Sequence, residues 1–300
     1  MAHADLVILG GGSGGYACAL RASELGLSVI LIDKDKLGGT CLHRGCIPTK
    51  ALLHAAEVAD SARESEQFGV NASLHGIDMV KVNEYRDGVV GRLYKGLQGL
   101  VKSRNVTFVE GAGRLVGPNT VEVNGEQVGT IWAAGGMLLM RQGGVIGVEF
   151  ASVWKSFGAE VTIIEGLPRL VPNEDEACSK ALERAFRKRG INFSTGVRFA
   201  SATQDDNGVH VTLEDGKTFD ADVLLVAVGR GPNASGMGFE EQGVAMERGW
   251  VLVDERLRTN IPSIFAVGDI TPGLQLAHRG FQHGIFVAEE IAGLRPMVIA

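Results

Sequence analysis

Residues 5–33 read DLVILGGGSGGYACALRASELGLSVILID, an apolar run, a cluster of glycines, and then a second apolar run. The first run predicts a short buried strand, and the residues after the glycines predict a helix that ends at Gly26. The second run, at 28–32, predicts another strand with Asp33 at its end. Strand, glycine turn, helix and strand in this order are typical of a dinucleotide-binding unit.

The glycines of this unit have a spacing that matters chemically. They follow the pattern Gly-x-Gly-x-x-Gly at Gly10, Gly12 and Gly15. Such a turn lets a pyrophosphate approach the N-terminus of the next helix, where backbone N–H groups bind anions. An acid at the end of the second strand, here Asp33, is placed to hold a ribose hydroxyl. The simpler alternative is a tight strand–helix turn that binds nothing.

The same unit recurs 132 residues later. The shift aligns four residues with counterparts of the same kind: Gly12 with Gly144, Gly15 with Gly147, Gly26 with Gly158, and Asp33 with Glu165. A helix over 145–157 and a strand over 161–164 follow in the same order, which predicts a second nucleotide site. The repeat is imperfect at its start. Gln142 stands in place of the first glycine, and the preceding strand, 137–140, is short and is followed by Arg141.

Residues 38–50, GGTCLHRGCIPTK, contain Cys41 and Cys46. Five steps of regular helix rise about 7.5 Å, which exceeds the usual Cα separation of a disulfide, roughly 4.4–6.8 Å. The pair can therefore close only across a distorted turn, and Gly45 makes such a turn easier. A strained disulfide at a helix N-terminus is easily reduced, and the helix lowers the thiol pKa, so the spacing indicates redox chemistry. Two unrelated thiols, or a zinc site with His43 that has no evident fourth ligand, are the alternatives.

Composition narrows the class of protein. The 300 residues suffice for two domains, and 29 basic against 35 acidic residues give a net charge of −6 without a basic run, which argues against a nucleic-acid partner. The longest uncharged apolar stretch, 128–140, is too short to span a membrane. Strand-like sequence begins by Leu6, which leaves no room for a signal peptide. Four cysteines do not make a secreted disulfide framework, so we expect a cytoplasmic protein.

The remaining elements follow from apolar periodicity and turn signals. We expect helices over 48–63 and 80–102 and from Ala277 onward. We expect strands over 106–110, 120–123, 209–213, 220–228 and 264–267. Asn124-Gly125 is a strong hairpin signal. Asp269 directly follows a buried strand, where an acid either meets a ligand at the sheet edge or caps the next helix.

These features together resemble the pyridine nucleotide–disulfide oxidoreductases, most of all their dihydrolipoamide dehydrogenase branch. The resemblance rests on these stretches: LVILGGGSGGYACAL, VILIDKDKLGGTCLHRGCIPTK, GGVIGVEFASVWKSFG, VTIIE, LLVAVGRGPN, TNIPSIFAVGD and LQLAH. It implies an α/β fold with two Rossmann-like dinucleotide-binding domains, the NAD domain inserted in the FAD domain. The implied boundaries are 1–136 and 253–300 for the FAD-binding domain and 137–252 for the NAD-binding domain.

The resemblance also implies roles for individual residues. Cys41 exchanges with the substrate dithiol, and Cys46 packs against the flavin. The residues implied to contact FAD are Gly10, Gly12, Gly15, Asp33, Lys50, Gly113, Asp269 and Ala277. Those implied to serve NAD are Gly144, Gly147, Glu149, Glu165, Val197 and Gly229. The implied reaction passes two electrons from dihydrolipoamide, on a lipoyl-carrying protein or as a small substrate, through the cysteines and FAD to NAD⁺.

Three departures from the family pattern limit what the resemblance implies. The linker before the second glycine turn is short, with 131–136 in place of an Ala-Thr-Gly-Ser segment. A non-glycine residue at 142 costs roughly 1–3 kcal/mol if the turn keeps a strained conformation. The sequence to Ala300 does not include the family's homodimer interface domain with its His–Glu base, so we expect impaired turnover. The alternatives are a non-catalytic FAD/NAD-binding remnant and a disulfide reductase of the glutathione or mercuric type.

Overall fold

A computed structural model describes residues 2–135, 138–139, 144–227 and 229–298. The chain forms two compact units, which are treated separately below. The first unit contains 1–48, 87–140 and 230–300, and the second contains 49–86 and 141–229. The second unit is thus inserted in the first, while the domain boundaries given above remain a proposal. Gln142 and Arg141, and two of the four residues of the strand expected over 137–140, lie outside the described residues.

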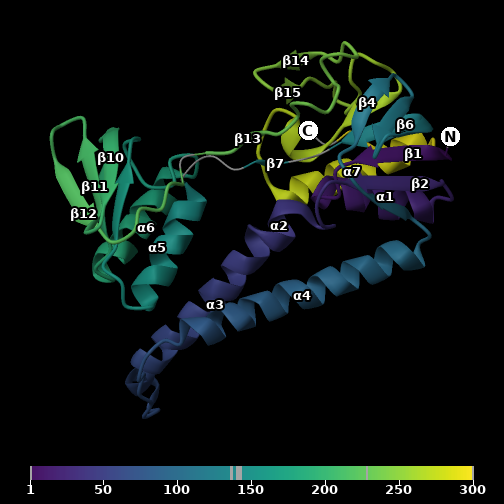
Figure 1. The fold of residues 1–300 in the computed structure, drawn as a ribbon. Helices are drawn as coiled ribbons and strands as arrows, with labels where there is room; N and C mark the ends of the chain where they lie inside the picture. The colour runs from purple at the N-terminus through teal and green to yellow at the C-terminus, as the bar shows by residue number, and fades with distance from the viewer. Residues whose placement is uncertain (1, 136–137, 140–143, 228, 299–300) are drawn as a thin grey trace. The chain divides into compact units, whose positions relative to one another are not determined.

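The first unit is built on a seven-stranded sheet with the order β3-β2-β1-β6-β5-β4, in which β16 also pairs with β6 (Figure 1). Strands β3, β2, β1, β6 and β16 run parallel, and β4 and β5 are antiparallel additions. The sheet strands are β1 (Ala2–Leu9), β2 (Val29–Asp33), β3 (Thr107–Glu110), β4 (Arg114–Gly117), β5 (Thr120–Val123), β6 (Glu126–Gly135) and β16 (Ile264–Ala266). The other elements are α1 (Ser13–Glu24), α2 (Gly39–His43), β7 (Leu138–Leu139), β13 (Gly231–Pro232), β14 (Met246–Glu247), β15 (Trp250–Val251), η2 (Gly268–Ile270) and α7 (Ala277–Ile291).

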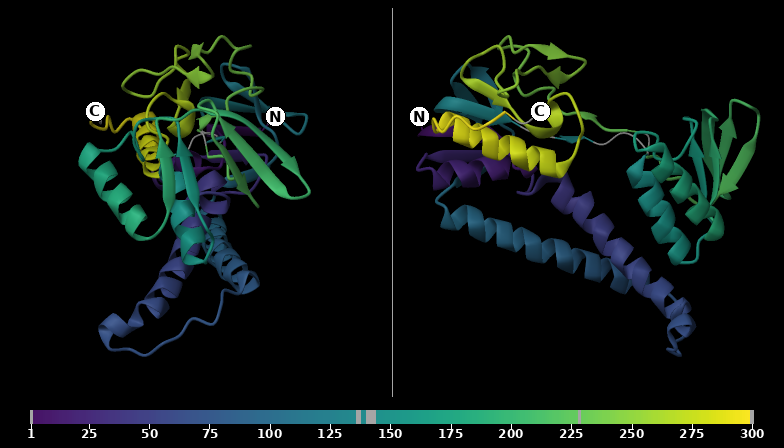
Figure 2. Two further views of the ribbon diagram at one scale, coloured as in Figure 1. Left: turned by 90° about the vertical axis from the view of Figure 1, so that its left-hand side faces the viewer. Right: turned by 180° about the vertical axis from the view of Figure 1, so that it is seen from behind.

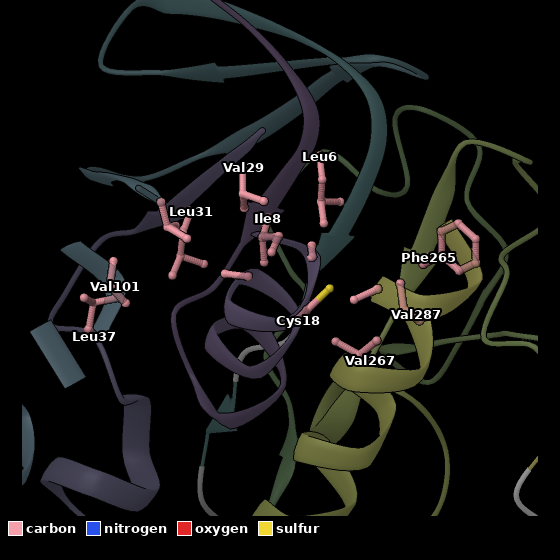
Figure 3. Packing of buried hydrophobic residues seen from close by; sticks show 14 of the residues in the cluster. Leu6, Ile8, Cys18, Val29, Leu31, Leu37, Val101, Phe265, Val267 and Val287 are labelled. Atoms are coloured by element: carbon pink, nitrogen blue, oxygen red, sulfur yellow. The ribbon is translucent and has the colours of Figure 1, made fainter. Parts of the chain in front are cut away.

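The core of this unit explains why the first apolar runs form central strands. Every residue of β2 is buried, and the side chains of Leu6 and Ile8 in β1 have no exposure. Helices α1 and α7 lie side by side in both views of Figure 2. Figure 3 shows Cys18 of α1 directed toward Val267 and Val287. The helices approach closely because α7 has glycine at the contact: a Cβ on Gly284 would lie 2.2 Å from the carbonyl oxygen of Gly14.

The second unit has two small sheets. Strands β8 and β9 are parallel, and β10, β11 and β12 form an antiparallel sheet. Its elements are η1 (Ser65–Phe68), α5 (Val145–Ser156), β8 (Thr162–Glu165), α6 (Glu176–Lys188), β9 (Asn192–Thr195), β10 (Phe199–Asp205), β11 (Gly208–Leu213) and β12 (Thr218–Ala221). Two helices, α3 (Cys46–Arg63) and α4 (Met79–Ser103), run from one unit into the other. Buried side chains of Ala151, Leu170, Phe186 and Ile191 form a core between its elements.

Most predicted elements are confirmed within two residues, and the Asn124-Gly125 turn has the positive φ angles, 53° and 79°, that its hairpin requires. Two expectations differ. The strand expected over 220–228 ends at Ala221, and the following side chains of Val223 and Val226 are 80% and 66% exposed. The expected strand before the second glycine turn is represented by β7, which pairs antiparallel with β13 of the first unit. The described part of that strand therefore does not continue the parallel sheet of the second unit.

Within the described ranges, no helix combines the length and the apolar composition needed to cross a membrane.

Candidate active site

The first glycine turn is closed around its own backbone. Gly10 has a φ of 103°, and a Cβ on Gly15 would lie 1.8 Å from the Gly10 carbonyl oxygen. The buried carboxylate of Asp33 accepts hydrogen bonds from the N–H groups of Gly11, at 2.6 Å, and Asp35, at 2.9 Å. The predicted acid therefore holds the shape of the glycine turn. Each of its oxygens keeps a further lone pair with which it can accept a ribose hydroxyl.

A cavity of about 110 Å³ opens beside this turn. It brings together three residues that the sequence singled out, Gly10, Asp33 and Gly113. Gly113 is required by the packing, because a Cβ there would lie 2.6 Å from Leu9 Cδ2. The sequence did not point to the opposite wall, which is formed by residues including Asn233, Ser235, Gly236 and Met237. The wall comes from a loop more than a hundred residues away in the chain.

The cysteine segment lies directly against the glycine turn. Gly38 and Gly39 have φ angles of 106° and 58°, and a Cβ on Gly39 would lie 2.8 Å from Gly12 Cα. Cys41 lies in α2 and Cys46 is the first residue of α3. The structure has the pair as two thiols, and their side chains share a hydrogen bond. The two cysteines are thus brought together at a position next to the predicted dinucleotide turn.

The electrostatics of Cys41 differ from the sequence prediction of a lowered thiol pKa. The shared hydrogen bond with Cys46, followed by burial, raises the pKa of Cys41. The backbone N–H of Cys46 and the charge of Arg230 lower this pKa, but their effect is smaller. The physical reason is that a thiol that donates to a neighbouring sulfur is stabilised in its protonated form. Burial, with the two cysteines as lesser causes, also raises the pKa of Tyr16 to about 12.

His43 lies between the two cysteines in sequence, but its ring is engaged elsewhere. Its Nε2 donates to the Leu37 carbonyl oxygen at 2.8 Å, and the ring packs edge-on against Tyr94 with centroids 5.0 Å apart. A carbonyl oxygen can only accept, so the proton of the neutral ring sits on Nε2. This geometry indicates that His43 stabilises the turn, and it argues against a role for His43 as a zinc ligand or as a base for the thiols.

The Gly268–Asp269 turn is held by two arginines. Gly268 has a φ of 69°, and the side chain of Asp269 is 14% exposed. Burial raises the pKa of Asp269, while Arg230, whose Nη2 lies 3.8 Å from Asp269 Oδ2, and Arg279 lower it. The buried Nε of Arg230 has no hydrogen-bond partner among the described residues. Ala277 is the first residue of α7, directly after this loop.

The second unit brings fewer of its predicted residues together. Lys50 forms an ion pair with Glu149, although the two are 99 residues apart in the chain. Glu165 Oε1 accepts the N–H of Leu167 at 2.9 Å, and its backbone carbonyl accepts the N–H of Val197 at 3.3 Å. Of the glycines predicted to serve NAD, Gly144 directly precedes α5, Gly147 lies in its first turn, and Gly229 has a φ of 147°.

Sequence reasoning missed four side chains that surround the first glycine turn and the cysteines: Tyr16, Arg230, Arg279 and His283. Arg279 and His283 could have been found, because their spacing of four residues puts them on one face of the helix predicted from Ala277. Tyr16 and Arg230 carry no such signal. Their positions become informative only when the distant segments pack together.

The chain matches known proteins along most of its length. The family model described as pyridine nucleotide-disulphide oxidoreductase matches residues 4–132 and 143–284. A dihydrolipoyl dehydrogenase of Bacillus subtilis is 36% identical over 342 residues, covering 97% of this chain and 72% of the relative. Those of Thermus scotoductus and Geobacillus stearothermophilus are also 36% identical, covering 96% of this chain and 71% and 70% of the relatives. Residues 133–142 fall between the two segments that match the family.

Proposed function

Because the chain belongs to the pyridine nucleotide-disulphide oxidoreductase family, we propose that it oxidises a dithiol substrate with Cys41 and Cys46, using FAD and NAD. The observation that carries the proposal is the pair of thiols that share a hydrogen bond on a segment packed against the glycine turn. The relatives are named dihydrolipoyl dehydrogenase, so the proposed substrate is a dihydrolipoyl group, on a carrier protein or as a small dithiol.

The first unit fits FAD. The glycine turn leaves no space for a side chain at Gly15, the neighbouring cavity is lined by Gly10, Asp33 and Gly113, and the Nε of Arg230 is a buried donor that lacks a partner among the residues described here. We propose that these residues and Gly12 hold the dinucleotide, with Lys50, Asp269 and Ala277 nearer the flavin. Bound FAD supplies the two-electron chemistry that links a dithiol to NAD.

The cysteines carry out thiol–disulfide exchange in this proposal. A substrate thiolate attacks Cys41 Sγ of the oxidised pair, the bond between the two cysteine sulfurs breaks, and Cys46 leaves as a thiolate. The second substrate thiolate then attacks the substrate sulfur of the mixed disulfide and releases Cys41. The substrate loses two electrons and two protons, and the pair becomes a dithiol. The shared hydrogen bond and burial raise the pKa of Cys41, and the positive charge of Arg230 opposes them, which stabilises the released thiolate.

The second unit is the proposed NAD site. An acid at 165 accepts hydrogen bonds from a ribose diol and repels a 2′-phosphate, so we propose NAD over NADP. Gly144, Gly147, Glu149, Val197 and Gly229 are the other proposed contacts. A pair of cysteines that cycles with NAD works in a reducing compartment, and we propose the cytoplasm.

A second candidate function is a chain that binds FAD without turning over NAD. It is favoured by the sheet of the second unit, because residues 222–227, where the sequence predicts a strand, lie outside any strand. The first candidate is preferred because the cysteine pair, which a remnant does not need, is held in a hydrogen-bonded arrangement.

The test is NADH formation from dihydrolipoamide beside NADH-dependent dye reduction on one FAD-loaded preparation. We expect Cys41→Ser and Cys46→Ser to lose the first activity by at least about 10³-fold while the second persists, because dye reduction needs only the flavin. Cys178→Ser, an exposed thiol elsewhere, is the matched control and should keep both activities. If the parent chain reduces the dye but does not oxidise the dithiol, it is a flavin enzyme with another substrate. If the parent chain has neither activity, the result supports the second candidate.

A further inference from the structure

Two side chains on one face of α7 form hydrogen bonds with the loop that follows β16. Arg279 Nη1 donates to the carbonyl oxygen of Leu274 at 3.1 Å, and its Nη2 donates to Thr271 Oγ1 at 3.2 Å and to the carbonyl oxygen of Pro272 at 2.5 Å. One helical turn later, His283 Nδ1 accepts the N–H of Gly268 at 3.2 Å. The arginine therefore holds the far end of the loop and also reaches the Gly268 carbonyl oxygen, at 3.5 Å, while the histidine holds the Gly268 N–H.

The bond to Gly268 defines the state of the imidazole. Nδ1 accepts a backbone N–H, so it carries a lone pair and the ring proton is on Nε2. Once Nδ1 is protonated, it can no longer accept the hydrogen bond from the Gly268 N–H. Burial, followed by the charge of Arg279, lowers the pKa of His283 to about 4, so the neutral acceptor persists through the physiological pH range.

Arg279 is the charged group that acts on His283, and the elements that pack near this loop carry further charged and titratable groups. Arg279 comes from α7 itself, Asp269 from η2, and Arg230 from the segment before β13. The facing helix α1 contributes Tyr16, whose ring packs against Phe281, and Cys18; burial is the leading cause that raises the pKa of each to about 12. These two groups stay uncharged near neutral pH. The arginines stay charged throughout the range in which His283 titrates, whereas burial raises the pKa of Asp269, so this carboxyl also gains a proton toward acidic pH, in the parent chain and in the His283 variants alike.

Gly268 adopts a left-handed backbone conformation, with a φ of 69°. The hydrogen bond of its N–H to His283 holds the residue in this conformation. This conformation sets the direction in which Asp269 leaves the sheet. The same segment packs on the glycine turn, since a Cβ on Gly14 would lie 3.1 Å from Val267 Cγ2 and 3.3 Å from the Gly280 carbonyl oxygen. A change in the conformation of the Gly268 turn therefore changes the position of the Asp269 carboxylate and the packing at the N-terminus of α1.

We propose that His283 is a positioning residue for FAD: as a neutral acceptor it fixes the N–H of Gly268, while Arg279 binds the Gly268 carbonyl oxygen and the rest of the loop. The proposal rests on FAD binding to the first unit. His283 does not touch the cofactor in this arrangement. It acts through Gly268, so its contribution disappears when the imidazole gains a second proton.

The test is the FAD dissociation constant of the full chain between pH 4 and 8, measured by quenching of flavin fluorescence. At pH 7, His283→Leu should weaken FAD binding about tenfold, because the Gly268 N–H loses its acceptor. His283→Gln, whose side-chain oxygen accepts a hydrogen bond at all these pH values, should restore the affinity to within about threefold. Gln282→Leu, an exposed neighbour on the same helix, is the control for leucine in α7.

The pH profile separates positioning from a packing role. The parent chain and Gln282→Leu should lose FAD affinity as the pH falls toward 4, whereas His283→Gln should follow a flatter profile. Equal profiles for the parent chain and His283→Gln overturn the proposal, and they do so even if His283→Leu fails to fold. If the parent chain binds FAD and His283→Leu binds it equally well, the proposal fails and the proposed function stands. If the parent chain does not bind FAD, both fail.

Discussion

The glycine turn before α1 is closed around its own backbone, whereas the glycines before α5 have only loose contacts with the residues that the structure describes, which do not include 141–143. A side chain at Gly15 collides with the Gly10 carbonyl oxygen at 1.8 Å, while a Cβ on Gly147 meets its nearest neighbour in the described part of the chain at 4.0 Å. The two turns share their spacing in the sequence. In the first unit the protein itself requires the glycines. In the second unit, the residue that corresponds to Gly10 is Gln142, which lies outside the described residues, and the described ones leave room for a Cβ on Gly147.

The surrounding sheets explain this difference. In the first unit, β1 lies between β2 and β6, and the parallel pairing on both sides fixes the level at which the strand ends. In the second unit, the described strand β8 pairs with β9, and the apolar residues at 223–226 lie outside any strand. The described residues of the expected entry strand pair in the first unit instead. A repeated motif therefore becomes a repeated site only where the strands around it pair in the same way.

The largest expected effect is that of alanine at the two turns. Gly15→Ala should destabilise the chain by about 3–5 kcal/mol and abolish FAD binding, because its Cβ meets backbone that has no room to move. Gly147→Ala should change the free energy of unfolding by less than about 1 kcal/mol. Urea unfolding of both variants measures the difference. Similar losses for the two variants would contradict the distinction between the turns.

The ion pairs of the two units offer the next comparison. Glu290 is 6% exposed and binds Arg256 and Arg258, whose hydrogen bonds and charges lower the pKa of this carboxyl. Glu290→Gln should cost about 3 kcal/mol, because the arginines lose their partner. Glu176→Gln breaks the exposed pair with Lys180 in the second unit and should leave the melting temperature nearly unchanged, because solvent screens an exposed pair. Equal thermal shifts for these variants would argue against the tighter packing of the first unit.

A glycine at position 142 tests whether the residue type at this position limits NAD binding to the second turn. Gln142→Gly gives this turn the glycine pattern of the first one and should tighten NADH binding about tenfold, if the turn adopts the strained conformation on binding. The measurement is the quenching of NADH fluorescence, with Gln127→Gly in β6 as a control for added glycine. An unchanged dissociation constant would mean that the sheet around the turn, and not residue 142, limits NAD binding.

The smallest expected effect concerns acid stability. The pKa of His283 is lowered from 6.5 to about 4 in the folded chain, so between these values the unfolded chain binds a proton that the folded chain does not. Folding stability should therefore fall as the pH decreases from about 6.5 to 4. In His283→Gln this contribution is missing, so its melting temperature should fall by a few degrees less than that of the parent chain over the same range. Calorimetry at several pH values checks the sign, and a steeper fall in the variant would refute it.

The sequence by itself determined the local features of this protein. Apolar runs and glycine spacing specify β1, α1 and β2, because burial and backbone conformation are properties of short segments. The segment that contains Cys41 and Cys46 and the turn at Gly268–Asp269 were likewise visible, since their chemistry depends on residue type and spacing. The same reasoning identified the hairpin at Asn124-Gly125.

Only the tertiary structure decided which of these local features meet. It placed Gly39 on Gly12, turned His43 away to the Leu37 carbonyl, and brought His283 to Gly268. It also gave the two similar glycine spacings differently paired strands. The physical reason is that hydrogen-bond partners, pKa values and crowding depend on groups that are distant in the chain. Their positions follow from how strands pair and helices pack, which the spacing of residues within one segment does not specify.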